Sequence, residues 1–124
     1  MSLLIHIAED EPRSARLLMQ LLESQLGSGL IFDYSSTVKE AIDLLKINPP
    51  DLFFLDLELA GRSGFDVLEA HANRNFPVVV TTARKDLAYT CFRYGVQDYL
   101  LKPLNQQDLF EAIRRCKRLF PLPH

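Results

Sequence analysis

The chain has 124 residues, of which 48% are hydrophobic and 24% are charged, values typical of one soluble globular domain. Its formal net charge of −2 gives no electrostatic basis for binding nucleic acid through this segment. No apolar run approaches the roughly 20 residues that a membrane-spanning helix requires, and the first residues lack the basic start of a secretory signal. We therefore expect a cytoplasmic domain that contacts neither nucleic acid nor membrane.

The first half of the chain alternates short apolar runs with longer segments of helical periodicity. This pattern predicts strands at 3–8, 30–34 and 51–56 and helices at 12–26 and 37–47. Gly27-Ser28-Gly29 ends the first helix. Asn48-Pro49-Pro50 ends the second, because the residue before a proline avoids the α region. The run Leu52-Phe53-Phe54-Leu55 is apolar on both faces, as expected of a central parallel strand covered by helices on both sides.

The second half continues the same alternation. It predicts a loop at 57–63, helices at 64–72, 86–94 and about 105–119, and strands at 77–82 and 96–101. Asn105 is a suitable N-cap for the last helix, with Asp108 at its third position. We expect one domain over residues 1–120 and a tail or the start of a linker at 121–124. Five βα units in this order predict an α/β fold around a parallel sheet.

The residues that follow the strands are unusually polar. In an open parallel sheet, the functional site lies beyond the carboxyl ends of the strands, and here these ends carry Glu9-Asp10, Asp56, Thr82 and Lys102. Converging carboxylates repel one another unless a cation neutralises them, and Mg²⁺ prefers oxygen ligands beside a phosphate. Polar strand ends are common by themselves. The combination of acids, hydroxyl and amine nevertheless favours a Mg²⁺-dependent site that stabilises a phosphoryl group.

Four motifs share the order and spacing of a known family. The segments IAEDEP at 7–12, PDLFFLD at 50–56, TA at 82–83 and DYLLKP at 98–103 resemble the motifs of response-regulator receiver domains of two-component systems. The resemblance spans about residues 3–119 and implies a flavodoxin-like, doubly wound (βα)5 fold with strand order 2-1-3-4-5. Segments 88–95 and 98–103 look most like receivers attached to LytTR-type DNA-binding outputs, which are transcription regulators.

The resemblance implies roles for the strand-end residues. Asp56 would be the phosphoacceptor, with Thr82 and Lys102 contacting the phosphoryl group. The Lys102–Pro103 peptide bond would be cis, which directs the amine back toward Asp56.

The metal ligands also follow from the resemblance. Asp10 would be the main Mg²⁺ carboxylate, with Glu9 and Asp56 beside it and the Glu58 backbone carbonyl as a further ligand. Glu9 stands where the family commonly has Asp, and its longer side chain favours a water-mediated contact with the metal.

Three further positions complete the expected site. Tyr99 would be the aromatic switch residue that responds to Thr82. Glu58 and Arg84 would lie at the mouth of the site, where an ion pair between them would tune the lifetime of the phosphorylated form. Ala60 replaces the usual proline of the loop after the phosphoacceptor, which we expect to loosen that loop.

The predicted function is a signalling switch rather than an enzyme, with only self-catalysed phosphotransfer and dephosphorylation. A sensor histidine kinase or small acyl phosphate would phosphorylate Asp56, and an output domain or effector protein would respond. A homodimer through the fourth helix, fifth strand and fifth helix is a further expectation. Two alternatives remain: a pseudo-receiver that signals without phosphorylation, and a small Mg²⁺-dependent phosphohydrolase with an Asp nucleophile. The second would need another acid and a substrate pocket, for which the chain is short.

Overall fold

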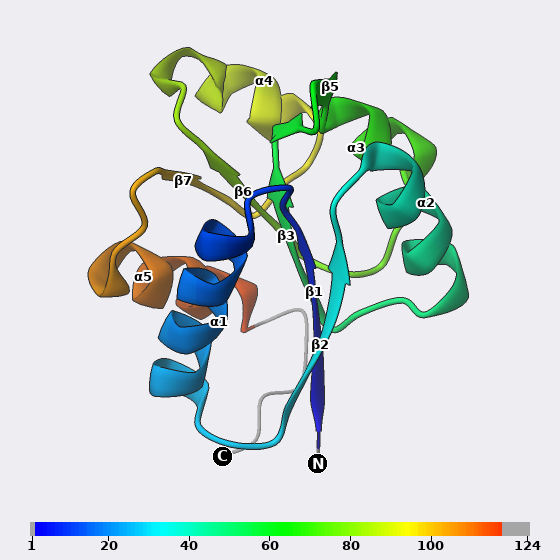
Figure 1. Ribbon diagram of the computed structural model, residues 1–124. Coiled ribbons are helices and arrows are strands. Elements are labelled where there is room, and N and C mark those ends of the chain that lie inside the picture. Colours follow the sequence, from blue (N-terminus) through cyan, green and yellow to red (C-terminus); the bar gives the residue numbers. More distant parts are fainter. Residues whose placement is uncertain (1, 118–124) are drawn as a thin grey trace.

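The computed structural model describes residues 2–117 and contains one five-stranded parallel sheet (Figure 1). Its strands lie in the order β2-β1-β3-β6-β7, with bounds β1 (Leu3–Ala8), β2 (Leu30–Ser35), β3 (Leu52–Asp56), β6 (Val78–Thr82) and β7 (Asp98–Leu101). Since β6 and β7 are the fourth and fifth strands of the sheet along the chain, this is the order 2-1-3-4-5. The flavodoxin-like fold predicted from the sequence is confirmed.

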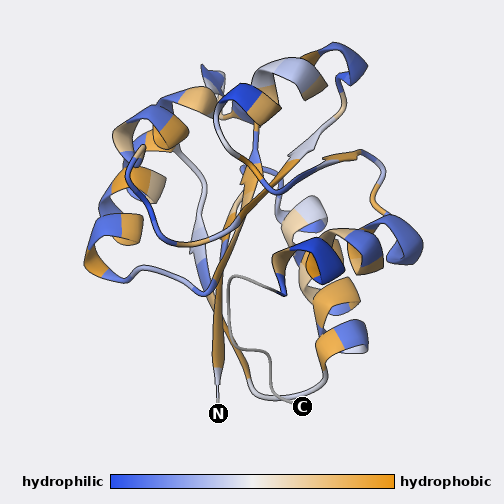
Figure 2. Cartoon of the chain, turned by 180° about the vertical axis from the view of Figure 1, so that it is seen from behind, coloured by the Kyte–Doolittle hydropathy of each residue, from blue (hydrophilic) through white to orange (hydrophobic). Residues whose placement is uncertain are grey.

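Helices cover both faces of this sheet (Figure 1). One face packs against α1 (Pro12–Leu26) and α5 (Gln106–Cys116), and the other against α2 (Val38–Ile47), α3 (Phe65–Ala70) and α4 (Ala88–Arg93). The central strand serves both layers, because Phe54 belongs to the first core cluster and Phe53 and Leu55 to the second. Figure 2 shows the hydrophobic strands between helices whose outer faces are hydrophilic.

The segment predicted as a loop at 57–63 instead contains a small hairpin. Strands β4 (Glu58–Leu59) and β5 (Arg62–Ser63) pair antiparallel. The two residues between them have positive φ, 52° at Ala60 and 79° at Gly61, as a tight two-residue hairpin turn requires. Proline cannot adopt a positive φ. The absence of proline at position 60 therefore permits this turn, and the expected loosening of the loop stays a prediction.

Several predicted boundaries also differ. The third helix is shorter than 64–72, and the fourth begins as a single 3₁₀ turn, η1 (Lys85–Leu87). The last strand starts at Asp98 rather than at 96, and just before it the Val78 N–H donates to the Gln97 side chain instead of to a backbone carbonyl. The predicted end of the last helix at 119 and the boundary at 120 fall outside the described residues.

Side chains cap the longer helices at their first turns. The Asn105 side chain accepts a hydrogen bond from the Asp108 N–H at the start of α5, which confirms that prediction. Glu11 and Thr37 cap α1 and α2 in the same way. Each cap fixes where a helix leaves the strand before it. In residues 2–117 the helices are all too short or too polar to cross a membrane.

Candidate functional site

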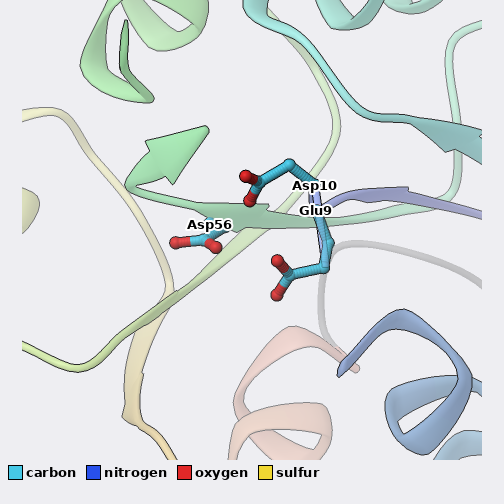
Figure 3. Close-up of side chains that lie close together, drawn as sticks. All are labelled: Glu9, Asp10 and Asp56. Atoms are coloured by element: carbon cyan, nitrogen blue, oxygen red, sulfur yellow. The ribbon is translucent and has the colours of Figure 1, made fainter. Parts of the chain in front are cut away.

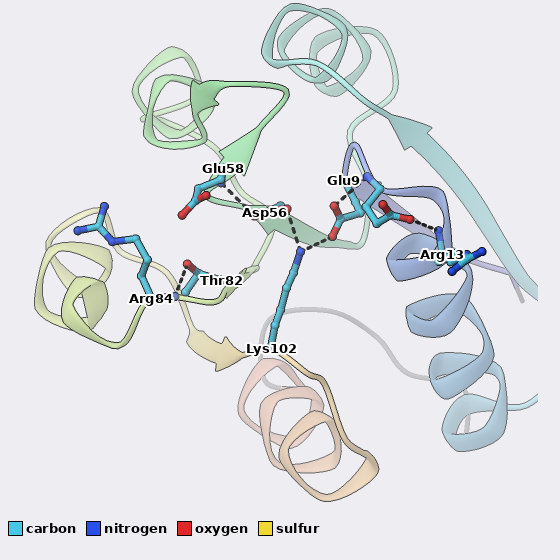
Figure 4. A network of polar contacts seen from close by, with 8 residues as sticks. Glu9, Arg13, Asp56, Glu58, Thr82, Arg84 and Lys102 are labelled. Carbon is cyan, nitrogen blue, oxygen red and sulfur yellow. Dashed lines mark hydrogen bonds and ion pairs between the residues drawn. The ribbon is translucent and has the colours of Figure 1, made fainter.

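Polar side chains from four strands lie at the carboxyl edge of the sheet (Figure 4). Asp56 is the last residue of β3 and Thr82 the last of β6, whereas Glu9 and Asp10 directly follow β1 and Lys102 follows β7. Because all five strands are parallel, these ends meet on one side of the molecule. The arrangement of β1, β3, β6 and β7 as neighbours places the predicted site residues around Asp56.

Three carboxylates form the acidic part of the site. One oxygen from each of Glu9, Asp10 and Asp56 lies within 4.8 Å of the others, and the side chains point toward one another (Figure 3). Glu9 and Asp56 are buried, whereas Asp10 is exposed. An all-oxygen donor set that is partly open to solvent fits Mg²⁺, which keeps several waters and takes one or two carboxylates from the protein.

Lys102 joins two of these carboxylates. Its Nζ donates hydrogen bonds to Glu9 Oε1 at 2.6 Å and to Asp56 Oδ2 at 2.9 Å (Figure 4). Burial raises the pKa of Glu9, an effect that the Lys102 bond partly offsets. Burial alone would lower the pKa of Lys102, but its bonds to Glu9 and Asp56 outweigh burial and raise it. The ammonium is therefore charged at neutral pH. The Lys102–Pro103 bond is cis, the geometry expected from the sequence.

The backbone around Asp56 fixes its second oxygen. Asp56 Oδ1 accepts a hydrogen bond of 3.0 Å from the Glu58 N–H. Gly64 packs directly against this turn, since its N–H donates to the Leu57 carbonyl at 2.8 Å. A Cβ at Gly64 would lie 2.5 Å from the Asp56 backbone oxygen, so only glycine fits without a backbone shift.

Thr82 and Tyr99 both contact the backbone of one residue. Thr82 is fully buried, and its Oγ1 accepts a hydrogen bond of 3.1 Å from the Arg84 N–H. The Tyr99 hydroxyl donates to the Arg84 carbonyl at 2.5 Å. Thr82 and Tyr99 are thus linked through the N–H and the carbonyl of Arg84.

The ion pair expected between Glu58 and Arg84 does not form in the described part of the chain. The Arg84 guanidinium binds Asp86 instead, at 2.6 Å, because that carboxylate is two residues away on the same turn. Glu58 and Arg84 nevertheless line one open cleft together with Asp10. They lie there as separate charges, and their position at the mouth of the site stays a prediction.

Sequence reasoning missed two features of this site. The Lys102–Glu9 bond was not predicted, although the extra methylene of glutamate at position 9 was a signal that this side chain reaches further. The close approach of Gly64 to Asp56 was also missed, because a glycine in a loop carries no sign of which backbone it meets.

Comparison with known proteins identifies the family. The model for the response regulator receiver domain matches residues 5–114, which is most of the chain. The chain belongs to this family. This match agrees with the motifs at the strand ends, and the family predicted from the sequence is confirmed.

Curated relatives of this receiver domain are regulatory and sensory transduction proteins. The positive alginate biosynthesis regulatory protein of Pseudomonas aeruginosa is 30% identical over 114 residues, covering 90% of this chain and 46% of the relative. The sensory transduction protein LytT of Enterococcus faecalis is 32% identical over 114 residues, covering 90% and 47%. The receiver domain thus spans about half the length of these relatives.

Solved structures similar to this receiver domain support the same assignment. The signal receiver domain of a LuxO repressor protein from Vibrio parahaemolyticus superposes with a TM-score of 0.83 at 27% identity, covering 96% of this chain and 93% of that one. A response regulator receiver protein from Burkholderia phymatum gives a TM-score of 0.79 at 26% identity, covering 98% and 100%.

Proposed function

We propose that this receiver domain accepts a phosphoryl group on Asp56 in a Mg²⁺-dependent reaction, from a sensor histidine kinase or a small acyl phosphate. The observation that carries the proposal is the placement of Asp56, a buried carboxylate with one oxygen on the Glu58 N–H and the other on the Lys102 ammonium. The reaction is self-catalysed and stoichiometric, so the domain acts as a switch and not as a turnover enzyme. We propose that the reaction takes place in the cytoplasm, where such phosphodonors would be available.

Each side chain has a distinct part in this reaction. An Asp56 carboxylate oxygen attacks the phosphorus, and the donor group leaves on the opposite side. Lys102 and Thr82 then stabilise the transferred group through ammonium and hydroxyl contacts with its oxygens. Asp10, Glu9, Asp56 and the Glu58 carbonyl would hold Mg²⁺. When bound, the ion supplies positive charge that neutralises the carboxylates and the incoming phosphoryl oxygens.

Acetyl phosphate tests this proposal directly. Incubation with acetyl phosphate and Mg²⁺, followed by intact-mass measurement, should add one phosphoryl group to the parent and none to Asp56→Asn. Asp43→Asn is the matched control, because Asp43 is exposed on α2 and, among residues 2–117, pairs only with Lys39. A parent that gains no mass would favour the pseudo-receiver, and continuous turnover of a phosphoester would favour the phosphohydrolase.

Metal dependence has its own test. Asp10 is exposed and lies after a strand end, so Asp10→Asn should leave the fold intact while weakening Mg²⁺ binding sharply. Mg²⁺ titration followed by NMR chemical shifts compares the two proteins. Equal affinities would move the metal site elsewhere.

We propose that phosphorylation reaches the surface through Thr82 and Tyr99. A phosphoryl group adds a charge close to −2 and strong acceptor oxygens, which would draw the Thr82 hydroxyl away from the Arg84 N–H and alter the segment that Tyr99 contacts. The surface of α4, β7 and α5 would then change its affinity for an output domain, an effector or a second copy. Exposed Phe92 on α4 and Phe110 on α5 support a contact there, since large apolar side chains favour association.

A pair of threonine variants separates this route from the chemistry. Thr82→Ala should still be phosphorylated on Asp56 but should show smaller phosphorylation-induced NMR shifts around Tyr99. Thr81→Ala is the matched control, because adjacent strand residues point to opposite faces. The route through Thr82 is wrong if both variants respond to phosphorylation like the parent.

The lifetime of the phosphorylated form is proposed to depend on Glu58 and Arg84. Their charges line an open cleft beside Asp10, and water that enters the site by this cleft would pass them. Arg84→Ala should change the dephosphorylation rate only modestly, because a partly exposed charge is worth about 0–1 kcal/mol. An unchanged rate removes Arg84 from this role.

A further inference from the structure

An open pocket lies at the amino edge of the sheet, at the opposite end of the central strand from Asp56. It is formed where α2 and α3 end and where β3 and β6 begin, on the face that these helices cover (Figure 1). Its volume of about 390 Å³ falls within the roughly 300–1,000 Å³ typical of small-molecule sites. The residues around Asp56 contribute nothing to its lining, so a ligand here would be separate from the phosphorylation chemistry.

The charged groups of this pocket are mainly positive. Lys46 and Arg74 both line it, and within residues 2–117 neither forms an ion pair. One carboxylate, that of Asp51, also lines it, but Asp51 Oδ2 accepts a hydrogen bond of 2.8 Å from the Leu4 N–H. Two cations against one carboxylate that is already engaged favour an anionic ligand.

Arg74 is the more unusual of the two cations, because its side chain is half-buried. Its guanidinium donates to the His71 carbonyl at 3.2 Å and to the Tyr94 carbonyl at 2.6 Å, and neither acceptor carries a charge. Burial lowers the pKa of Arg74, the direction expected of a cation with no carboxylate beside it. Withdrawing a charge from water costs free energy unless an opposite charge lies nearby. An anionic group in the pocket would offset that cost.

The apolar part of the lining is fixed in place. The Phe76 ring packs edge-on against Phe53, with 5.9 Å between ring centroids, and lies 6.3 Å from the His71 ring. Pro49 and Pro77 add rigid apolar surface beside it. A preformed apolar wall next to a few charged groups is the usual composition of a site for a small organic molecule.

We propose that this pocket binds a small organic anion, whose phosphate or carboxylate group contacts Lys46 and Arg74 and whose flat apolar body packs against Phe76. The site goes beyond the proposed function, since binding requires neither Mg²⁺ nor phosphorylation of Asp56. Arg74 also connects the pocket to α4, because the Tyr94 carbonyl that it binds directly follows that helix. An anion that attracts the guanidinium therefore weakens its bond to Tyr94.

Phenyl phosphate is a suitable probe, because it joins a flat apolar ring to an anionic group. Added without Mg²⁺ and followed by ¹H–¹⁵N NMR, it should cause saturable shifts at the backbone amides of Asn73, Asn75 and Phe76. The Gly95 amide should also shift, since its N–H and the Tyr94 carbonyl belong to one peptide unit. A ligand of this size is expected to have a dissociation constant of about 1 mM.

Three smaller probes separate the parts of the ligand. Benzoate carries a carboxylate on the same ring, and the tighter of benzoate and phenyl phosphate shows which anion the site prefers. Inorganic phosphate lacks the ring, and phenol lacks the ionised group at neutral pH. Both should bind more weakly than phenyl phosphate. Phenol that binds as tightly overturns the role of the anion, and inorganic phosphate that binds as tightly overturns the role of the apolar body.

Variants on α2 test the charge without disturbing the core. Lys46 is exposed, so Lys46→Met should fold normally and weaken phenyl phosphate about 3-fold, as expected for one exposed ion pair. Lys46→Glu replaces that attraction by repulsion and should weaken it about 10-fold. Lys39→Met is the matched control, because Lys39 is exposed on the same helix and lies outside the pocket. Its dissociation constant should equal that of the parent.

The Arg74 contact has a separate test. Arg74→Met should weaken phenyl phosphate at least about 10-fold, the effect of losing a hydrogen bond between charged groups. Because Arg74 also holds two backbone carbonyls, Lys46→Glu and the Gly95 amide keep the test decisive if Arg74→Met does not fold. A Gly95 amide that stays still while Asn75 and Phe76 shift overturns the contact with Arg74.

Two results would overturn the site as a whole. One is the absence of saturable shifts at Asn73, Asn75 and Phe76 with phenyl phosphate and benzoate up to about 10 mM, ten times the expected dissociation constant. The other is an equal dissociation constant for the parent and Lys46→Glu, since binding would then not depend on the charge that lines the pocket.

Discussion

The buried histidine on β1 predicts a specific sensitivity to acid. His6 is 0% exposed, its Nε2 lies 2.8 Å from Ser35 Oγ, and its Nδ1 has no hydrogen-bond partner within residues 2–117. The ring packs edge-on against Phe53, with 5.2 Å between ring centroids. Burial lowers the pKa of His6 from 6.5 to about 4, although the Asp33 carboxylate partly opposes the shift. The native state therefore holds this imidazole neutral.

The size and sign of the effect follow from proton linkage. Between pH 6.5 and 4 the unfolded chain protonates this histidine and the folded one does not, so the unfolded state binds more protons. His6 therefore does not lower the free energy of unfolding above pH 6.5, and it lowers that free energy as the pH falls from 6.5 to about 4. Below pH 4, His6 lowers it no further. A shift of this size, at 1.36 kcal/mol per pKa unit, amounts to about 3 kcal/mol.

Chemical denaturation at several pH values measures this contribution. His6→Phe keeps an aromatic ring beside Phe53 but cannot be protonated, so its unfolding free energy should fall about 3 kcal/mol less than that of the parent between pH 7 and 4. Ile5→Val on the same strand is the control for a general loss of core packing, and it should keep the slope of the parent. Parallel pH profiles for the parent and His6→Phe would refute the argument, since carboxylates would then account for all of the acid sensitivity.

Four further substitutions, at three positions, test the local backbone by chemical denaturation. Gly64→Ala should cost about 1–3 kcal/mol and slow phosphorylation, because its Cβ would meet the Asp56 backbone oxygen at 2.5 Å. Ala60→Gly should stabilise the hairpin by about 0.5 kcal/mol and Ala60→Pro should destabilise it by more, since the φ of 52° suits glycine and excludes proline. Asn105→Ala should cost about 1 kcal/mol through loss of the cap on the Asp108 N–H. Unchanged unfolding free energies would contradict each argument separately.

The sequence predicts those parts of the fold that follow from a regular pattern of apolar residues along the chain. The apolar run around Phe53 and Phe54 indicates a strand buried on both faces, and both residues are in fact fully buried on opposite sides. Because parallel strands end at the same edge of a sheet, the proximity of Glu9, Asp56 and Lys102 could be predicted without any knowledge of loop structure. The hairpin at Ala60 was not predictable in this way, because only the second residue of its turn, Gly61, favours a positive φ, whereas alanine at the first does not.

Side-chain contacts within the site were harder to predict than the positions of its residues. The sequence indicates that Glu58 and Arg84 lie near each other, but Arg84 binds Asp86 because a neighbour on the same turn requires less ordering of two long side chains. Similarly, Glu9 was expected to differ from aspartate only in how it contacts a metal. The partner that it reaches, Lys102, is 93 residues away, so no local pattern identifies it.

The two expected switch residues, Thr82 on β6 and Tyr99 on β7, both form hydrogen bonds with the backbone of Arg84. The Arg84 N–H donates to Thr82, and the Arg84 carbonyl accepts from Tyr99. A movement of the Thr82 hydroxyl toward Asp56 would break the first bond and leave the Arg84 N–H, a partly buried donor, without that partner, which costs about 1–3 kcal/mol unless the segment rearranges. Rearrangement of this segment also displaces the acceptor of the Tyr99 hydroxyl. Under the proposed function, loss of the Thr82 bond therefore favours a new position of Tyr99, and the coupling needs no contact between the two side chains.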